Sequence, residues 1–186
     1  MATTVTADLF VSVDGFAKGE RSPGYFGYGG PELESWIADE LARPQRILLG
    51  RRTYAALSQV PPEAQDDGYR QMTSTPATVF SRTLTDADWP GATIESGDAV
   101  AHVRGLKEGD DLPLRTMGSL SVVQQLLDAG LVDRLRLVVF PLLVGPSGRE
   151  PGFAGVGETE LELVDVRRLD GRLVLLEYAP TGRPIP

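Results

Sequence analysis

The stretch TMGSLSVVQQLLDAGLVDRLRLVVFPLLVG, residues 116–145, decides the fold of this chain. Its first residues close an apolar segment, residues 112–117, that is typical of a buried strand. Apolar residues then recur at helical spacing from Leu120 to Leu127, and a second strand-like segment follows at residues 135–140. The order strand, small-residue turn, helix and strand indicates one unit of a parallel α/β sheet.

The turn of this unit, Gly118-Ser119, lies where the strand leads into the helix. We expect the Ser119 hydroxyl to cap the helix and Gly130 to end it. The first backbone N–H groups of such a helix are unpaired and lie at the positive end of its dipole, which favours an anion such as a pyrophosphate. The alternative is an ordinary structural unit with no ligand, and the turn taken alone favours that alternative.

The rest of the chain alternates strand and helix patterns and closes with two alternating segments joined by Asp170-Gly171, a typical hairpin turn. Two segments rich in Gly, residues 16–30 and 141–157, predict loops, and the first is either a lid or a surface loop. The remaining pattern predicts strands at 3–13, 45–49, 75–80, 92–95, 112–117, 135–140, 159–169 and 172–178, and helices beginning at 31, 51, 97 and 120 with a short one at 69–72. We therefore expect a single α/β domain over residues 1–180, with a mixed, mostly parallel sheet of about eight strands flanked by helices and an antiparallel C-terminal hairpin. A loose tail is expected over residues 181–186.

Composition excludes several classes of function. The 186 residues include no cysteine and one histidine, His102, so disulfides, thiol nucleophiles and multi-histidine metal sites within one chain are excluded, and we expect no metal. The formal net charge of −8 argues against nucleic acid as a partner. No apolar run is long enough to cross a bilayer and the start, MATTVTADLF, lacks signal-peptide features, so we expect a cytoplasmic protein without a membrane partner. His102 falls on a predicted helix away from the strand ends, and we assign it no catalytic role.

Polar turns follow three predicted strands, at Gly50-Arg51-Arg52-Thr53, at Ser81-Arg82-Thr83 and at Gly118-Ser119-Leu120-Ser121. Ligands of open α/β sheets bind at the carboxyl ends of the strands, where these turns lie. Arginine at a helix start costs roughly a few tenths of a kcal/mol against the dipole unless an anion offsets it, and its planar guanidinium suits a phosphate monoester. The turns therefore favour a phosphorylated ligand over surface arginines, although the GxGxxG and GxxxxGK[ST] fingerprints are absent.

Four motifs occur in a familiar order: VSVDGFAKG at 11–19, LLGRRTYAAL at 48–57, TVFSRTL at 78–84, and the segment 117–148. In this respect the chain resembles bacterial dihydrofolate reductase-like proteins, above all those built like the reductase domain of riboflavin biosynthesis. The resemblance covers nearly the whole chain, and the combination of motifs is specific although each motif is weak. It implies a sheet of eight strands, NADPH as the cofactor, and a homodimer.

The resemblance also implies roles for the turns. The residues matching the adenosine 2′-phosphate side are Gly50, Arg51, Arg52 and Thr53, with a second contact at Ser81, Arg82 and Thr83. Those matching the pyrophosphate turn and helix start are Met117, Gly118, Ser119, Leu120, Ser121 and Val122. Asp14, Gly15 and Ala17 match the first loop, which closes near the nicotinamide. The family commonly has two or three glycines at the pyrophosphate turn, so a side chain at Ser119 narrows the approach.

Two carboxylates are candidates for the catalytic step. In folate-reducing relatives a carboxylate on the helix after the first loop pairs with the pterin, and Glu34 lies closest to that position. A Glu that faces a partly apolar cleft has a raised pKa and can donate a proton. The alternative is that Glu34 belongs to the solvated face of an amphipathic helix. Asp14 is the second candidate, and its alternative is to make the turn that ends the first strand.

The resemblance and the turns together predict an NADPH-dependent reductase that transfers a hydride to a small, cyclic or heteroaromatic C=N or C=O substrate. The cofactor supplies the hydride chemistry, and the protein orients it and supplies a proton. The alternative function is a non-catalytic protein of the same fold that binds NADPH or another phosphorylated ligand.

Overall fold

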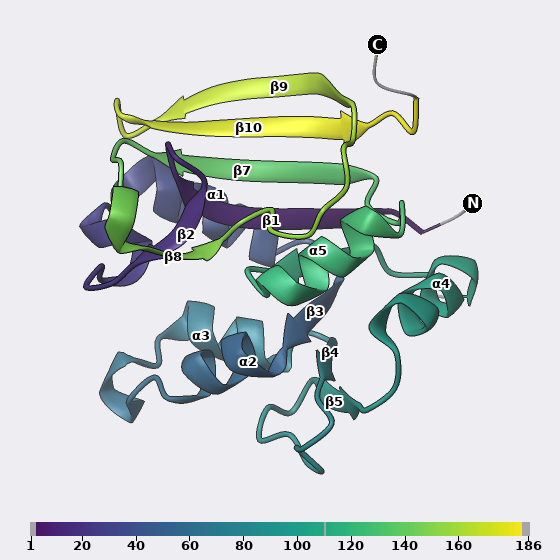
Figure 1. Ribbon diagram of the computed structural model, residues 1–186. Helices are drawn as coiled ribbons and strands as arrows, with labels where there is room; N and C mark the ends of the chain where they lie inside the picture. The colour runs from purple at the N-terminus through teal and green to yellow at the C-terminus, as the bar shows by residue number, and fades with distance from the viewer. Residues whose placement is uncertain (1–2, 110, 184–186) are drawn as a thin grey trace.

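A computed structural model describes residues 3–109 and 111–183 of the chain. Its main sheet has eight strands in the order β5-β4-β3-β6-β1-β7-β10-β9 (Figure 1). These strands are β1 Val5–Ser12, β3 Arg46–Gly50, β4 Ala77–Phe80, β5 Ala92–Glu95, β6 Leu114–Met117, β7 Arg134–Phe140, β9 Leu161–Leu169 and β10 Leu173–Pro180. All neighbours from β5 to β7 are parallel, whereas β10 is antiparallel to both β7 and β9. The predicted α/β fold with an antiparallel C-terminal hairpin is confirmed.

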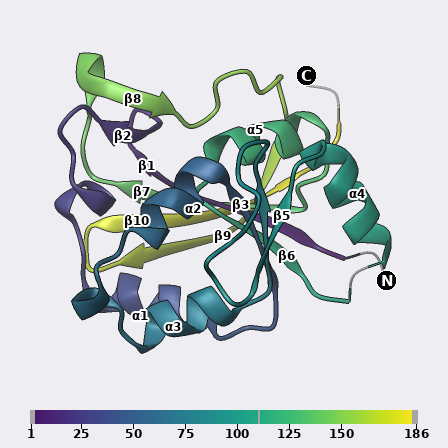
Figure 2. The ribbon, with the colours of Figure 1, turned by 90° about the horizontal axis from the view of Figure 1, so that it is seen from below.

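Helices cover both faces of this sheet. They are α1 Pro31–Leu41, α2 Arg51–Ser58, α3 Asp67–Ser74, α4 Ala99–Gly109 and α5 Leu120–Asp128. Figure 2 shows α4 and α5 on one side of the sheet and α1 and α3 on the other. Among the described residues, no helix combines the length and the apolar character that crossing a membrane requires.

Strand alternation sorts the core into two faces. On one face, Val5, Leu9 and Val11 of β1 are at most 3% exposed and pack with residues of α4 and α5. On the other face, Val138 and Phe140 of β7 pack with apolar residues of α1. Each fully buried side chain of this kind contributes about 1.5–3 kcal/mol relative to exposure, so the two faces hold the helices on the sheet.

The segments expected as loops contain a second, small sheet. Strand β2 Phe16–Gly19 pairs antiparallel with β8 Gly148–Pro151, and Phe16 lies opposite Pro151. The Gln124 amide of α5 donates to the carbonyl oxygens of Pro151 (3.0 Å) and Gly152 (3.1 Å), which ties this sheet to the helix. The prediction of irregular structure over 16–30 is therefore wrong for its first residues, because their pairing partner lies far along the chain.

The end of the chain remains attached as far as the structure describes it. The Thr181 N–H donates to the Glu160 carbonyl oxygen (3.0 Å), and Arg183 Nε lies 2.7 Å from a carboxylate oxygen of Glu160. Residues 184–186 of the expected tail lie outside the described residues.

Candidate functional site

The turns after β3 and β6 are joined to each other by side-chain hydrogen bonds. The Gly50 N–H donates to Ser119 Oγ (2.9 Å), and the Ser119 N–H donates to Thr53 Oγ1 (3.1 Å). Ser119 Oγ in turn donates to the Met117 carbonyl oxygen (3.1 Å). The two turns predicted to hold opposite parts of a dinucleotide therefore form one bonded unit.

The expectation that the Ser119 hydroxyl caps α5 is wrong. Ser119 precedes the helix with φ 57° and ψ 52°, and its side chain makes no capping hydrogen bond. The preceding Gly118 also has a positive φ of 57°. The side chain is 7% exposed and points back to Gly50, because two successive left-handed residues turn it away from the helix start. Gly130, with φ 65°, follows the end of α5 as predicted.

The start of α5 offers two backbone donors. The Leu120 and Ser121 N–H groups have no hydrogen-bond partner among residues 3–109 and 111–183, as expected for the first turn of a helix. By contrast, the Val122 N–H donates to the Ser119 carbonyl oxygen (2.8 Å), and the Val122 side chain is buried in the core. Of the residues predicted at this helix start, Leu120 and Ser121 therefore present free donors to an anion and Val122 supplies packing.

The arginines of the other two turns are exposed. Arg51 and Arg52 open α2, and Arg82 follows β4. Strands β3 and β4 are paired so that Gly50 lies opposite Phe80, which places Arg51 and Ser81 at the same sheet edge. Within the described part of the chain the three guanidinium groups have no carboxylate or hydrogen-bond partner, so all three are available to an anion.

Ser81 itself is a structural residue of its turn. Ser81 is 7% exposed, and its hydroxyl accepts from the Thr83 N–H (3.2 Å) and the Leu84 N–H (3.0 Å). This bonding shapes the turn and leaves Arg82 and Thr83 exposed. The predicted contact at Ser81 is therefore better placed at its two neighbours.

Asp14 holds the first loop against the segment after β7. Its carboxylate accepts from the Ser12 hydroxyl (2.7 Å), the Gly145 N–H (2.8 Å) and the Val144 N–H (3.2 Å). Hydrogen bonds from Ser12 and then from Gly145 lower the pKa of Asp14 below its ordinary value of 3.8. A carboxylate held in its ionised form is a poor proton donor, so this bonding argues for a positioning role. Ala17, the other predicted residue of this loop, lies in β2.

Glu34 is an exposed residue of α1. Its carboxylate has no hydrogen-bond or ion-pair partner within residues 3–109 and 111–183. The buried carboxylate of this helix is Glu40, two turns later and 5% exposed. The position of Glu34 matches the alternative of a solvated helix face.

Sequence reasoning missed a buried cluster of charges under α1. Asp8 of β1 pairs with Arg115 Nε of β6 (2.6 Å) and with Arg136 Nε of β7 (2.7 Å), and Arg136 Nη1 also pairs with Glu40 (2.7 Å). The two guanidinium groups lie over the Trp36 ring, with Cζ 5.9 Å and 5.2 Å from its centroid. Alternation along β1 places Asp8 on the face opposite its apolar neighbours, but the identity of its partners depends on β6 and β7 flanking β1 in the sheet.

An aromatic cluster lies beside these strand ends. Tyr25 and Phe26 both have φ of 52°, an unusual conformation for large side chains that is concentrated at functional segments. Tyr25 lies 5.1 Å from the Phe10 ring, and Phe26 lies 5.4 Å from the Phe140 ring. Because Phe10 and Phe140 belong to β1 and β7, the segment after β2 folds back onto the central strands.

The expectation that His102 lies away from all strand ends is wrong. His102 Nδ1 is 3.0 Å from a carboxylate oxygen of Glu95, the last residue of β5. Its ring contacts Phe80, the last residue of β4, edge-on with centroids 5.7 Å apart. Helix α4 runs back toward this edge, so a residue in the middle of the helix reaches two strand ends.

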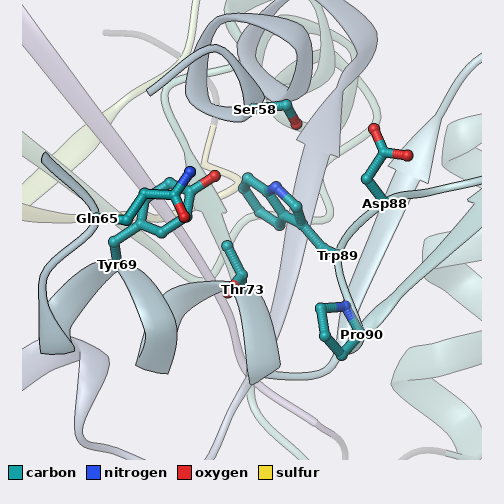
Figure 3. Close-up of a pocket in the computed structure, with 7 residues that line it drawn as sticks. All are labelled: Ser58, Gln65, Tyr69, Thr73, Asp88, Trp89 and Pro90. Atoms are coloured by element: carbon teal, nitrogen blue, oxygen red, sulfur yellow. The ribbon is translucent and has the colours of Figure 1, made fainter. Parts of the chain in front are cut away.

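A cavity of about 300 Å³ lies near the start of β5, away from the strand ends that carry the three turns (Figure 3). Ser58 at the end of α2 and Trp89 just before β5 form part of its wall, with the other lining residues Gln65, Tyr69, Thr73, Asp88 and Pro90. None of the turns after β3, β4 and β6 lines it. Among the described residues, no three His, Cys, Asp or Glu side chains lie together in a metal-binding group.

Comparison with known proteins agrees with this architecture. A curated relative from Bacillus subtilis (strain 168), named Uncharacterized protein YyaP, is 26% identical over 184 residues, which are 96% of this chain and 95% of that protein. Among solved structures, a putative riboflavin biosynthesis protein from Shewanella sp. PV-4 has a TM-score of 0.73 and 20% identity, covering 97% of this chain and 99% of that one. A pyrimidine reductase-like protein from Corynebacterium diphtheriae has a TM-score of 0.67 and 18% identity over 97% of this chain and 93% of that one.

A two-activity protein matches over part of its length. The Thermotoga maritima diaminohydroxyphosphoribosylaminopyrimidine deaminase/5-amino-6-(5-phosphoribosylamino)uracil reductase has a TM-score of 0.68 and 17% identity over 96% of this chain and 57% of that one. These structural likenesses show a shared fold. The model of the RibD C-terminal domain matches residues 3–175, and the chain therefore belongs to the RibD C-terminal domain family.

Proposed function

We propose that this protein is an NADPH-dependent reductase that transfers a hydride to a small cyclic or heteroaromatic C=N or C=O substrate. The observation that carries the proposal is the edge formed by the turns after β3, β4 and β6. There, three exposed arginines without partners among the described residues and two free N–H groups at the start of α5 accompany a bonded pair of turns. The α2 dipole disfavours Arg51 and Arg52 by roughly a few tenths of a kcal/mol, and an anion bound at this edge offsets that cost.

Each turn fits one part of the cofactor. The Leu120 and Ser121 N–H groups suit the pyrophosphate at the positive end of the α5 dipole. Arg51, Arg52 and Arg82 suit the extra phosphate of NADPH because guanidinium groups bind phosphate through paired hydrogen bonds. The uncharged residues of these turns contribute to the shape of the site. They are Gly50, Thr53, Ser81, Thr83, Met117, Gly118, Ser119 and Val122.

The substrate side lies next to β1. Asp14 and Ala17 position the first loop there, and the aromatic segment around Tyr25 supplies flat apolar surface for a ring. Glu34 makes no competing contact within the described residues, so we retain it as the candidate proton donor. When bound, NADPH supplies the hydride, and these groups orient the acceptor and deliver the proton. The Thermotoga maritima relative is named as a 5-amino-6-(5-phosphoribosylamino)uracil reductase, which makes aminopyrimidines of this kind one substrate class to test.

Ligand titration tests the cofactor assignment. We expect NADPH to raise the melting temperature more than NADH does, because NADH lacks the phosphate that we assign to the arginines. A ligand at one hundred times its Kd adds about 2.7 kcal/mol of stability. Arg82→Ala removes one charged phosphate contact and is expected to weaken NADPH binding about tenfold, with a smaller effect on NADH. Arg168→Ala on β9 is the matched control, because Arg168 is exposed at the other edge of the sheet. Failure of both dinucleotides to bind contradicts the assignment.

Turnover separates the enzyme from the second candidate, a non-catalytic protein that binds NADPH or another phosphorylated ligand. NADPH oxidation is followed against pteridines, cyclic carbonyl compounds and the 5-amino-6-(5-phosphoribosylamino)uracil for which the Thermotoga maritima reductase is named. Oxidation that Glu34→Gln slows without weakening NADPH binding supports the reductase. Tight binding without oxidation of NADPH by any member of the panel supports the binding protein. We further propose that the protein acts in the cytoplasm as a homodimer.

A further inference from the structure

The carboxylate of Glu95 lies next to the Ser81-Arg82 turn, which we propose as part of the binding site for the extra phosphate of NADPH. Strands β4 and β5 end in register, with Phe80 opposite Glu95, and the Ser81 N–H donates to the Glu95 carbonyl oxygen (2.9 Å). Glu95 therefore adjoins the Ser81-Arg82 turn directly. Its side chain is 30% exposed, and one carboxylate oxygen accepts from the Gly97 N–H (2.6 Å), which fixes it at this edge.

A bare carboxylate at this position opposes phosphate binding. Like charges repel in proportion to their inverse distance, and at a partly exposed edge the repulsion is only partly screened. The arginines of the same edge attract the phosphate, so Glu95 works against them. A partner that neutralises Glu95 therefore strengthens phosphate binding at this edge.

His102 is placed to do so. Its Nδ1 lies 3.0 Å from the second carboxylate oxygen of Glu95, its ring rests on Phe80, and its side chain is 29% exposed. The charged groups around it are Glu95 from β5 and Asp98, the residue just before α4, whose carboxylate accepts from the Ala101 N–H (2.8 Å). Phe80 from β4 carries no charge. With a protonated imidazole the Glu95–His102 pair is neutral, and with a neutral imidazole it carries one negative charge.

We propose that His102 is a positioning residue of the dinucleotide site, which offsets Glu95 and so sets the preference for NADPH over NADH. The idea rests on the proposed function and adds to it a residue and a pH dependence. Because a histidine side chain is charged only when it is protonated, the charge of the pair depends on pH. Protonation of His102 raises the preference for NADPH, so the advantage of wild type over a variant without this imidazole falls as pH rises.

Four forms of the protein test this charge arithmetic: wild type, His102→Gln, Glu95→Gln and the double variant. Isothermal titration calorimetry measures the ratio of Kd for NADH to Kd for NADPH. The measurement is made at about pH 5.5 and about pH 8.5, toward the two ends of the range in which histidine side chains generally change charge. At the lower pH we expect the preference for NADPH to be weakest in His102→Gln and strongest in Glu95→Gln. Wild type and the double variant lie between them at the same level. At the higher pH wild type falls to the level of His102→Gln, and the two variants that lack Glu95 stay above both. Each unit of charge is expected to change the ratio about three- to fivefold, as for a partly exposed ion pair.

The double variant distinguishes this role from ordinary packing. If His102 only anchored α4, Glu95→Gln would not restore the preference lost in His102→Gln, and that result overturns the inference. A wild-type ratio that changes with pH in the same way as that of His102→Gln also overturns it while leaving NADPH binding in place, because the phosphate of NADPH itself changes charge over this interval. If no form binds either dinucleotide, the proposed function itself fails, and the inference fails with it. Since His102 is the single histidine of the chain, its imidazole resonances report its protonation directly in each form.

Discussion

Ser119 holds the two proposed phosphate turns together through one buried hydroxyl. Removing it leaves the Gly50 N–H without its partner, because the acceptor is Ser119 Oγ at 2.9 Å. An unpaired buried donor costs about 1–3 kcal/mol, so Ser119→Ala is expected to lower the free energy of unfolding by that amount. Urea denaturation measures it, with the exposed neighbour Ser121→Ala as control, for which a change within about 0.5 kcal/mol is expected. Equal stability of Ser119→Ala and wild type would show that the two turns do not depend on this bond.

Asp14 gives a second prediction at the same scale, now in pH. Hydrogen bonds from Ser12 and Gly145 lower its pKa in the folded protein below the ordinary value of 3.8. The group therefore contributes stability that is fully present above the unfolded pKa and is lost as pH falls through the folded pKa. Asp14→Asn should melt at a lower temperature than wild type at neutral pH, and the difference should shrink as the pH falls below about 4. A difference in melting temperature that is constant from neutral to acid pH contradicts this account.

The elements show how far sequence patterns reach. Residue spacing predicted each strand of the main sheet, because periods of two and of about 3.6 residues depend on neighbours along the chain. It failed for β2 and β8, since Phe16 pairs with Pro151 and nothing local marks that pairing. It also failed for His102, whose partners Phe80 and Glu95 come from two strands. The candidate phosphate turns were predictable because each directly follows a strand, whereas the Ser119 bonds depend on two left-handed residues that the sequence does not specify.

The docking of α1 on the sheet gives a prediction at this scale. Asp8 is 3% exposed and is the shared partner of Arg115 and Arg136, so Asp8→Asn leaves two buried cations without their carboxylate. Breaking a buried ion pair from one side costs about 3–5 kcal/mol. We expect this loss in urea denaturation, accompanied by release of α1 in hydrogen exchange. Glu34→Gln on the exposed side of the same helix is the control, with no comparable change expected. A loss below about 1 kcal/mol in Asp8→Asn would mean that Glu40 alone holds Arg136 and that the cluster does not anchor the helix.

At the scale of the whole molecule, β9 is exposed along nearly its full length. Strand β9 is one of the two outer strands of the sheet, and its exposed apolar side chains include Leu161 (37% exposed), Leu163 (54%) and Val166 (51%). Leu163 lies opposite Tyr178 and Val166 opposite Leu176 of β10, so they continue one face of the sheet. An apolar edge of this length promotes pairing with another chain, and a second copy of the protein presents the same surface. This is the surface on which we expect the homodimer to form.

Light scattering coupled to size exclusion tests the dimer. The chain has a mass of 20.0 kDa, so two copies give 2 × 20.0 = 40.0 kDa. Leu163→Glu places a charge on the proposed contact and is expected to shift the protein to the monomer mass, because burying an unpaired carboxylate is unfavourable. The control Val174→Thr, on neighbouring β10, adds polarity without charge and is expected to weaken the dimer less. NADPH affinity of the monomeric variant should stay close to wild type, since β9 and the strand-end turns lie at opposite parts of the sheet. A wild-type protein that remains at the monomer mass at high concentration contradicts the prediction, and a dimer that survives Leu163→Glu moves the interface to another surface.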